Sequence, residues 1–179
     1  MERVLRGENI RLRPLRREDL PRRLEMVNDP EVQRLWVGVP ADQNTLEDLE
    51  MWFYLVSQGP PSEQWAIETA DGRYVGDIDF HSIDEVQGEA WFSVLIGERE
   101  LFGEAFRRDV YVTFLRYAFG QRGLRRLRIQ IADSDEVGVR VLEQLGFCVV
   151  DRAPFDIFEG VDELTMELDA ERFSPPNQQ

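Results

Sequence analysis

The chain has 179 residues, of which 42% are hydrophobic and 31% charged, which is typical of one globular domain. Its formal net charge of −14 disfavours nucleic acid and anionic membrane surfaces as partners and favours a cationic substrate. Every basic residue is an arginine, which excludes Schiff-base chemistry on a lysine of this chain. The sequence contains no apolar run of membrane-spanning length and no signal-peptide pattern, so we expect a cytoplasmic protein.

A single cysteine and a single histidine narrow the chemistry further. Cys148 follows Phe147 in an apolar run, so we expect a buried, inert thiol. One cysteine cannot form an internal disulfide or a thiolate cluster, and His81 alone cannot build a histidine-rich metal site. We therefore expect no metal.

The first half of the chain predicts one strand, three helices and a hairpin. Asp29-Pro30 interrupts the helical pattern that begins near Arg17, and Thr45 is a helix N-cap. Asp71-Gly72 is typical of a hairpin turn. The expected elements are strand 9–14, helices 17–28, 30–36 and 46–56, loops 38–43 and 59–62, and strands 64–69 and 74–81.

The second half carries the clearest pattern, between residues 89 and 147. A turn at 82–88 leads into a strand at 89–96, and Gly103 opens a long helix with an apolar stripe. Gly120 and Gly123 stand where that helix should end. Alternating residues predict a strand at 126–131, and residues 133–135 offer N-caps for a helix at 137–145. Residues 171–179 are expected to form a mobile tail.

Small residues mark the start of the long helix. Gly103 and Ala105 flank Glu104 at this strand-to-helix junction. A helix N-terminus offers free N–H groups and a partial positive charge, and small residues let an anion approach them closely. An isolated match of this kind is also explained by a turn glycine at a helix start.

The order of the motifs resembles the GNAT superfamily of N-acetyltransferases, and most closely the branch that acetylates ribosomal-protein N-termini. Glu100-Leu-Phe-Gly-Glu-Ala-Phe106 resembles the family's pyrophosphate loop, and the stretch 135–147, ending Leu-Gly-Phe, resembles its next motif. The stretches 5–14, 28–32 and 162–166 fit the same branch in order, so the resemblance covers nearly the whole chain. It implies one α+β domain over residues 1–179, with a mixed, mostly antiparallel sheet, splayed central strands and flanking helices.

The resemblance also implies a function, which is transfer of an acetyl group from acetyl-CoA to a primary amine by direct attack. The central strand would polarise the thioester through its backbone. The aromatic side chains of the two helices before residue 59 would line the acceptor side, although core packing is the commoner explanation for each of them taken singly. The implied cofactor residues are Val94, Leu95, Ile96, Leu101, Phe102, Gly103, Glu104, Ala105, Phe106 and Asp135, and the implied substrate residues are Trp36, Trp52 and Asp77.

A general base must take a proton from the ammonium form of the amine. Asp77, Asp79 and His81 alternate along one strand and so share a face. Asp79 and His81 are the candidate bases, and Glu89 on the next strand is the competitor. A solvated polar face of an antiparallel strand is the competing explanation.

Several positions depart from the family pattern. Glu104 stands where a basic residue is common, Asp135 replaces a frequent Asn, and Leu142 occupies the place where many relatives carry a tyrosine that protonates the leaving thiolate. These departures favour the alternative function, a non-catalytic binding or regulatory module with a degenerate CoA site. A protein N-terminus, an aminoglycoside-like amine, a polyamine and an amino acid all remain open as acceptors, and a homodimer remains open as the assembly.

Overall fold

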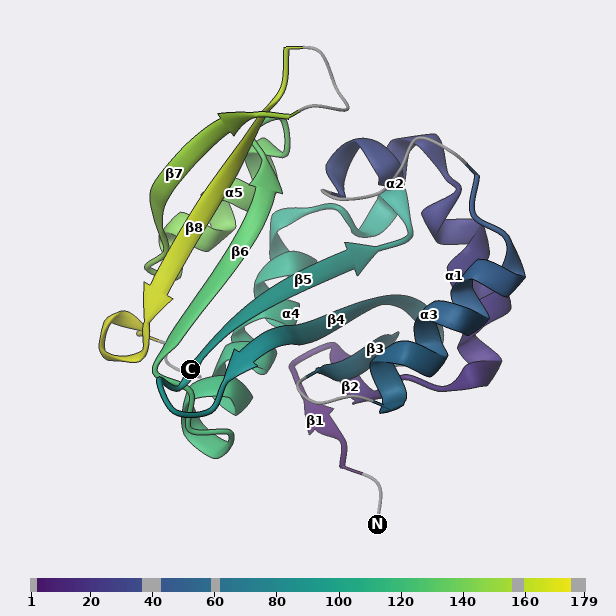
Figure 1. Ribbon diagram of the computed structural model, residues 1–179, viewed down its shortest axis with the longest axis horizontal. Coiled ribbons are helices and arrows are strands. Elements are labelled where there is room, and N and C mark those ends of the chain that lie inside the picture. Colours follow the sequence, from purple (N-terminus) through teal and green to yellow (C-terminus); the bar gives the residue numbers. More distant parts are fainter. Residues whose placement is uncertain (1–2, 37–42, 59–61, 156–159, 175–179) are drawn as a thin grey trace.

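The computed structural model describes residues 3–36, 43–58, 62–155 and 160–174, and these build one eight-stranded sheet (Figure 1). The strand order is β1-β2-β3-β4-β5-β6-β8-β7, and every neighbouring pair is antiparallel except β5 and β6. The strands are β1 (Leu5–Arg6), β2 (Ile10–Pro14), β3 (Glu63–Thr69), β4 (Tyr74–Asp84), β5 (Glu89–Ile96), β6 (Arg126–Ala132), β7 (Cys148–Pro154) and β8 (Asp162–Asp169). This arrangement confirms the predicted α+β class with a mixed, mostly antiparallel sheet.

Helices cover both faces of the sheet (Figure 1). On one face α1 (Leu20–Val27), α2 (Pro30–Leu35) and α3 (Leu46–Gln58) pack over β3, β4 and β5. On the other face α4 (Glu104–Arg116) and α5 (Glu136–Gln144) pack against the same sheet. Short helical turns complete the chain at η1 (Arg17–Asp19), η2 (Arg99–Leu101), η3 (Tyr117–Gln121) and η4 (Ala170–Arg172). No helix in the described part of the chain is long and apolar enough to cross a membrane.

Side-chain oxygens cap three of the helix starts, and the caps at Thr45 and Asp135 were predicted. The Asp29 carboxylate accepts hydrogen bonds from two backbone N–H groups at the start of α2. Thr45 and Asp48 bond reciprocally at the start of α3, as in a capping box. Asp135 caps α5 by accepting a hydrogen bond from Gly138 N at 3.1 Å.

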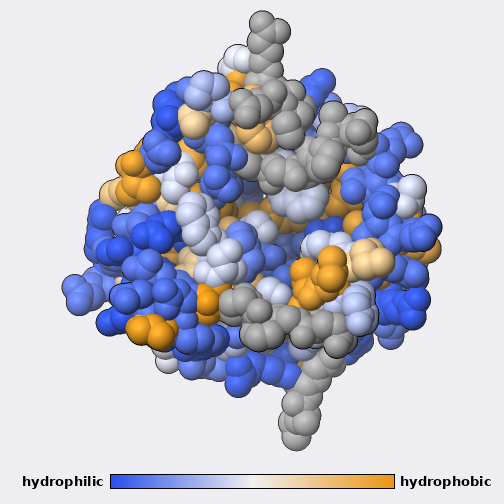
Figure 2. Space-filling model, in the orientation of Figure 1, coloured by the Kyte–Doolittle hydropathy of each residue, from blue (hydrophilic) through white to orange (hydrophobic). Residues whose placement is uncertain are grey.

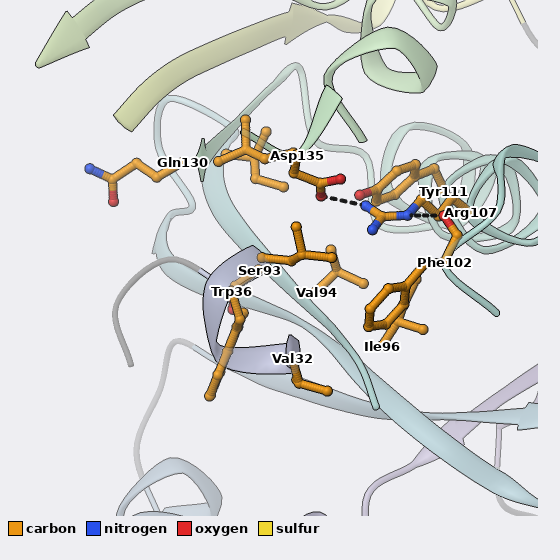
Figure 3. A pocket seen from close by; sticks show the side chains of 13 residues that line it. Val32, Trp36, Ser93, Val94, Ile96, Phe102, Arg107, Tyr111, Gln130 and Asp135 are labelled. Carbon is orange, nitrogen blue, oxygen red and sulfur yellow. Dashed lines mark hydrogen bonds and ion pairs between the residues drawn. The ribbon is translucent and has the colours of Figure 1, made fainter. Parts of the chain in front are cut away.

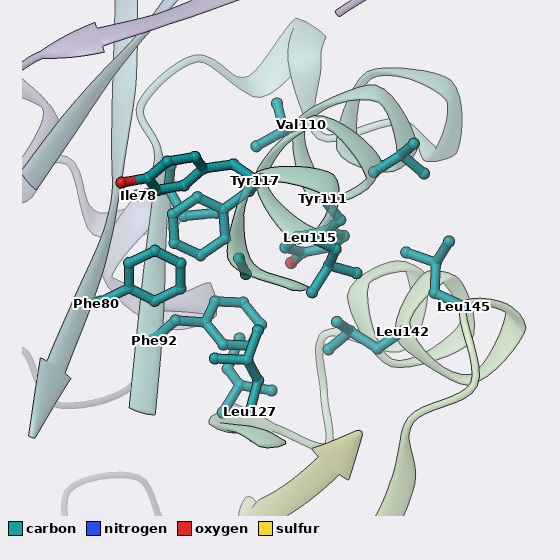
Figure 4. Packing of buried hydrophobic residues seen from close by; sticks show 14 of the residues in the cluster. Ile78, Phe80, Phe92, Val110, Tyr111, Leu115, Tyr117, Leu127, Leu142 and Leu145 are labelled. Carbon is teal, nitrogen blue, oxygen red and sulfur yellow. The ribbon is translucent and has the colours of Figure 1, made fainter. Parts of the chain in front are cut away.

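Aromatic packing fills the core between the sheet and α4 (Figure 4). Phe80 stacks on Phe114 with ring centroids 4.1 Å apart, and Phe92 contacts both Phe114 and Phe147. Ile78 and Phe80 lie on this face of β4, as the alternation predicts, while Asp77 and Asp79 lie on the other.

The parallel pair β5 and β6 is joined only at one end. The register pairs Glu89 with Arg126 and continues for three positions, up to Trp91 with Arg128. Beyond them the strands diverge (Figure 1), although β6 remains paired with β8 along its whole length. This separation is the predicted splay of the central strands, and it opens the sheet where the candidate site lies.

Some expectations were wrong. Cys148 is exposed, not buried, because it begins the edge strand β7, whose seven residues are all exposed. β1 was not predicted, since two residues carry no usable periodicity. The turn expected at 82–88 begins later, because β4 continues to Asp84.

The end of the long helix and the C-terminal segment are defined by local packing and backbone conformation. The long helix ends in the π-type turn η3, which contains Gly120, and Gly123 follows in the left-handed region with φ of 75°. Phe173 packs on Phe119 with ring centroids 5.5 Å apart, so the expected tail is attached to the core at that point. Residues 175–179, most of the loop 38–43 and residues 59–61 lie outside the described residues.

Candidate active site

A pocket lies where β5 and β6 diverge (Figure 3). Its lining comes from both strands, from α4 and the N-cap of α5 on one face of the sheet, and from α2 and the residue after it on the other face. In the orientation of Figure 1, the space-filling view shows a largely hydrophilic surface that is hollowed near its middle (Figure 2). The lining residues are Val32, Leu35, Trp36, Ser93, Val94, Ile96, Phe102, Arg107, Tyr111, Ile129, Gln130, Ile131 and Asp135.

The N-terminus of α4 has the properties that a phosphate group needs. Gly103 is the N-cap with φ of −67°, so no left-handed conformation requires a glycine there. A Cβ atom on Gly103 would meet no described heavy atom within 4 Å, so packing does not require a glycine either. The N–H groups of the first turn have no side-chain cap. Glycine is an ordinary N-cap residue, and the open space around Gly103 would let an anionic phosphate approach the free N–H groups.

Glu104 does not face this position as an uncompensated charge. Its carboxylate lies 2.6 Å from Arg108 Nη2 and 3.5 Å from Arg140 Nε. The hydrogen bond from Arg108 lowers the pKa of Glu104. The repulsion expected between Glu104 and a phosphate is therefore offset by two neighbouring guanidinium groups.

A buried ion pair forms the inner wall of the pocket (Figure 3). Arg107 Nη1 lies 2.5 Å from Asp135 Oδ2, and Arg107 Nε donates to the Phe102 carbonyl at 2.9 Å. Both charged side chains are buried. The pair ties the loop before α4 to the start of α5, and it compensates the negative charge that Asp135 would otherwise present to a bound molecule.

Tyr111 lies one helical turn beyond Arg107 and lines the same pocket. Its side chain is buried, and its hydroxyl has no hydrogen-bond partner within the described residues. Burial raises the pKa of Tyr111 to about 12, and the nearby Arg107 guanidinium opposes that rise. Leu142, in contrast, is fully buried in the hydrophobic core.

On the opposite face, Asp79 is the centre of a polar cluster beside the pocket. Its carboxylate accepts hydrogen bonds from Ser93 N at 3.0 Å, Ser93 Oγ at 2.5 Å and Gln64 Nε2 at 3.1 Å. His81 Nδ1 lies 3.5 Å from the same carboxylate. Burial acts to raise the pKa of Asp79, but the hydrogen bonds from His81 and Ser93 outweigh it, so the pKa lies below its ordinary value. Asp79 is therefore a carboxylate at neutral pH, and Ser93 connects it to the pocket.

The other predicted acceptor residues surround Arg23. Asp77 is buried and accepts a hydrogen bond from Arg23 Nε at 2.8 Å, and burial raises its pKa while Arg23 opposes that effect. The Arg23 guanidinium also lies 3.9 Å from the ring centroid of Trp52 and 5.4 Å from that of Trp36. Trp36 lines the pocket, whereas Asp77 and Trp52 contact the buried Arg23 guanidinium.

Glu89 lies at the end of β5 that is paired with β6, away from the divergence. Its carboxylate contacts Arg126 at 3.3 Å and Arg128 at 3.1 Å. Both contacts tie the carboxylate to neighbouring arginines, and Glu89 is not among the described residues that line the pocket. Asp79 and His81 do not line the pocket either, but Asp79 bonds directly to the lining residue Ser93, and that contact favours the Asp79–His81 pair over Glu89 as the base.

The structure thus brings together part of the predicted set. Val94, Ile96, Phe102 and Asp135 line the pocket, and Leu101, Gly103, Glu104, Ala105 and Phe106 form the loop and first turn beside it. The Leu95 side chain packs in the core under α1 to α3, so only its backbone is available to a ligand. Three further lining residues were not predicted from the sequence, namely Ser93, Arg107 and Tyr111. The spacing of Arg107, Tyr111 and Leu115 at intervals of four was the signal that could have placed the first two on the inner face of α4.

Comparison with known proteins agrees with this geometry. Residues 9–148 match the family model described as acetyltransferase (GNAT) domain. Spermidine N(1)-acetyltransferase of Escherichia coli (strain K12) is 26% identical over 144 residues, which are 80% of this chain and 75% of the relative. These matches do not single out the ribosomal-protein branch.

Solved structures share the fold. A spermidine N-acetyltransferase from Vibrio cholerae, in complex with CoA and spermine, has a TM-score of 0.82 at 21% identity, over 93% of this chain and 98% of that one. A GNAT-family acetyltransferase from Bacillus anthracis has a TM-score of 0.76 at 17% identity, over 94% and 99% of the two chains. Because the family model matches most of its length, this chain belongs to the GNAT acetyltransferase family and is an acyltransferase.

Proposed function

We propose that this enzyme transfers the acetyl group of acetyl-CoA to a primary amine of a small polycation of the spermidine type. The observation that carries the proposal is the pocket at the divergence of β5 and β6, whose lining comes from both faces of the sheet. Such a pocket allows two substrates to meet from opposite sides. When bound, acetyl-CoA supplies an acetyl group already activated as a thioester.

The α4 side of the pocket supports the acetyl-CoA assignment. The uncapped first turn of α4 would hold the pyrophosphate through backbone N–H groups, with Gly103 allowing the close approach. The stretch of β5 from Ser93 to Ile96 pairs with β4 along one edge, and β6 does not bond to its other edge, so backbone groups on that open edge are available to the pantetheine arm. The Vibrio cholerae relative, solved with CoA, supports the same ligand class.

The α2 side supports a cationic acceptor. Asp79 is held as a carboxylate by Ser93, Gln64 and His81, and none of its hydrogen-bond partners in the described part of the chain is an arginine. It can therefore attract an ammonium group to the edge of the pocket. The net charge of −14 would concentrate polycations at the surface. Relatives named for spermidine point to the same class.

Proton removal is assigned to the Asp79–His81 pair. A lowered pKa makes Asp79 a good anchor for a cation and a weak base. His81, 3.5 Å away and partly exposed, is therefore the better base, and Asp79 would orient its ring. The proton passes to His81 directly or through one water molecule.

The test is release of free thiol from acetyl-CoA over a panel of acceptors. We expect turnover with spermidine and spermine, slower turnover with a monoamine, and none with a neutral amide. A peptide with a free N-terminus represents the acceptor class that the sequence motifs suggested. Higher kcat/KM for the peptide than for spermidine would contradict the polyamine assignment, and absence of turnover with every amine, despite acetyl-CoA binding, would favour a non-catalytic module.

A further inference from the structure

The Tyr111 hydroxyl is the most unusual polar group in the pocket. The residue is 1% exposed, and its O–H proton has no acceptor among the described residues, because the Arg107 guanidinium beside it can only donate. A buried hydroxyl without a partner destabilises a fold, and most such groups are bonded to protein or to ordered water. Tyr111 also lines the pocket between the diverging strands (Figure 3). An unsatisfied donor in this position is explained if the pocket's ligand accepts its hydrogen bond.

Packing fixes the direction of this donor. The Tyr111 ring meets the Phe92 ring edge-on, with centroids 6.4 Å apart, and both belong to the hydrophobic core cluster that also contains Leu115 and Leu142 (Figure 4). The buried Arg107 guanidinium lies one turn before it on α4. The ring is therefore held by apolar contacts, and its hydroxyl lies beside a cation that favours negative charge nearby.

The other hydroxyl in the pocket provides the second observation. Among the described lining residues only Ser93 and Tyr111 carry hydroxyl groups, and the Ser93 hydroxyl donates to Asp79. The Tyr111 hydroxyl therefore remains the available hydroxyl donor in the pocket.

We propose that the Tyr111 hydroxyl donates a hydrogen bond to the sulfur atom of acetyl-CoA as negative charge develops there during acetyl transfer. This inference rests on the proposed function. The amine nitrogen forms a bond to the carbonyl carbon, the C–S bond breaks, and its electron pair goes to sulfur. One ammonium proton goes to the base on β4 before the attack, and the nitrogen loses a second proton to solvent as the amide forms. Solvent protonates the sulfur as the product leaves.

Relative acidity decides between hydrogen-bond donation and full proton transfer. Burial raises the pKa of Tyr111 to about 12, whereas an ordinary thiol has a pKa of about 8.5. The proton therefore stays on the phenol, and Tyr111 acts by electrostatic stabilisation. Removing one such preorganised donor lowers kcat by about 10²- to 10³-fold.

The test compares Tyr111→Phe with wild type in three measurements. We expect kcat to fall by about 10²- to 10³-fold while KM for acetyl-CoA is nearly unchanged. The thiol of bound CoA, followed by the ultraviolet absorbance of its thiolate, should ionise at a higher pH in the variant. The ligand-free variant should melt at the same temperature as wild type or higher, because an unsatisfied hydroxyl has been removed.

Tyr117→Phe is the matched control. The Tyr117 hydroxyl donates to Glu63 Oε2 at 2.7 Å and accepts from Arg3 Nη1 at 2.9 Å, outside the pocket. We expect this variant to melt lower than wild type and to keep the wild-type kcat and thiol titration.

Unchanged thiol ionisation and a kcat within threefold of wild type in Tyr111→Phe would overturn the role of Tyr111 alone. If ligand-free Tyr111→Phe melts clearly lower than wild type and the thiol titration is unmoved, the hydroxyl is structural and the proposal also fails. Failure of wild type to bind CoA would overturn the proposed function, and this inference with it.

Discussion

Replacement of Gly103 by valine tests the cofactor end of the pocket, because the structure predicts that the fold tolerates it. Gly103 is exposed, its φ of −67° and ψ of 160° suit a β-branched residue, and no described atom lies within 4 Å of the added Cβ. The loss of stability at an N-cap should be about 1 kcal/mol or less. A large loss of binding would then arise from the ligand and not from unfolding.

The expected magnitude follows from the N–H groups of Glu104, Ala105 and Phe106, which the first turn of α4 leaves without intrahelical partners. A hydrogen bond to a charged group contributes about 1.5–3 kcal/mol. If the valine side chain prevents two of them, acetyl-CoA affinity falls by about 3–6 kcal/mol, or about 10²- to 10⁴-fold in Kd.

Calorimetric titration with acetyl-CoA measures this loss, and thermal melting followed by circular dichroism checks the fold. Gly120→Val is the control, since Gly120 is also exposed and an added Cβ there would likewise meet no described atom within 4 Å. It lies in η3, at the far end of the helix, and should leave the affinity unchanged. A folded Gly103→Val protein with wild-type affinity would refute the assignment of the pyrophosphate to this turn.

Four further outcomes are expected. Glu104→Gln should tighten acetyl-CoA binding severalfold at low salt and less at high salt, because it leaves neighbouring arginines uncompensated; weaker binding in titrations at both salt concentrations would contradict this. His81→Gln and Asp79→Asn should each lower kcat/KM by about 10²-fold or more without changing acetyl-CoA affinity, whereas Glu89→Gln should have little effect; the reverse order would make Glu89 the base. Asp77→Ala should lower the free energy of unfolding in urea by about 3–5 kcal/mol, since it leaves a buried cation unpaired, and a neutral result would contradict the structural role of that carboxylate. The pKa of Asp79 is lower in the folded protein than the unfolded value of about 3.9. The ionised Asp79 carboxylate therefore stabilises the fold above that unfolded pKa, and this stabilisation is lost as pH falls through the folded pKa. Asp79→Asn should accordingly lose less unfolding free energy than wild type on acidification below about pH 4.

Local chemistry explains why most of the fold could be predicted. Caps at Thr45 and Asp135 and the turn at Gly72 are recognised from one or two residues, and each is present in the structure. Exposure at an edge strand depends on what does or does not cover it, which no local pattern contains. Cys148 was therefore misjudged, because an apolar run is equally compatible with a core strand and with β7.

The site was predictable only in part, for the same reason. The small residues at the start of α4 belong to a local motif, so the sequence identified them. The partners of charged side chains are set by the tertiary fold, and the pairing of Arg107 with Asp135 joins residues 28 positions apart. The position of Tyr111 beside that pair depends on the same helix packing. Sequence alone could count these charges but could not tell which are compensated.

A thermal-shift titration with acetyl-CoA, CoA and an unrelated nucleotide tests the central claim that acetyl-CoA binds where β5 and β6 diverge. At a ligand concentration of 100 times Kd, binding adds about 2.7 kcal/mol to stability. For a chain of this size, that stabilisation corresponds to a rise in Tm of about 5–11 °C. We predict this rise for acetyl-CoA and CoA, its loss in Gly103→Val, and no comparable rise with the nucleotide. Equal shifts for all three ligands, or a full acetyl-CoA shift in Gly103→Val, would contradict the claim.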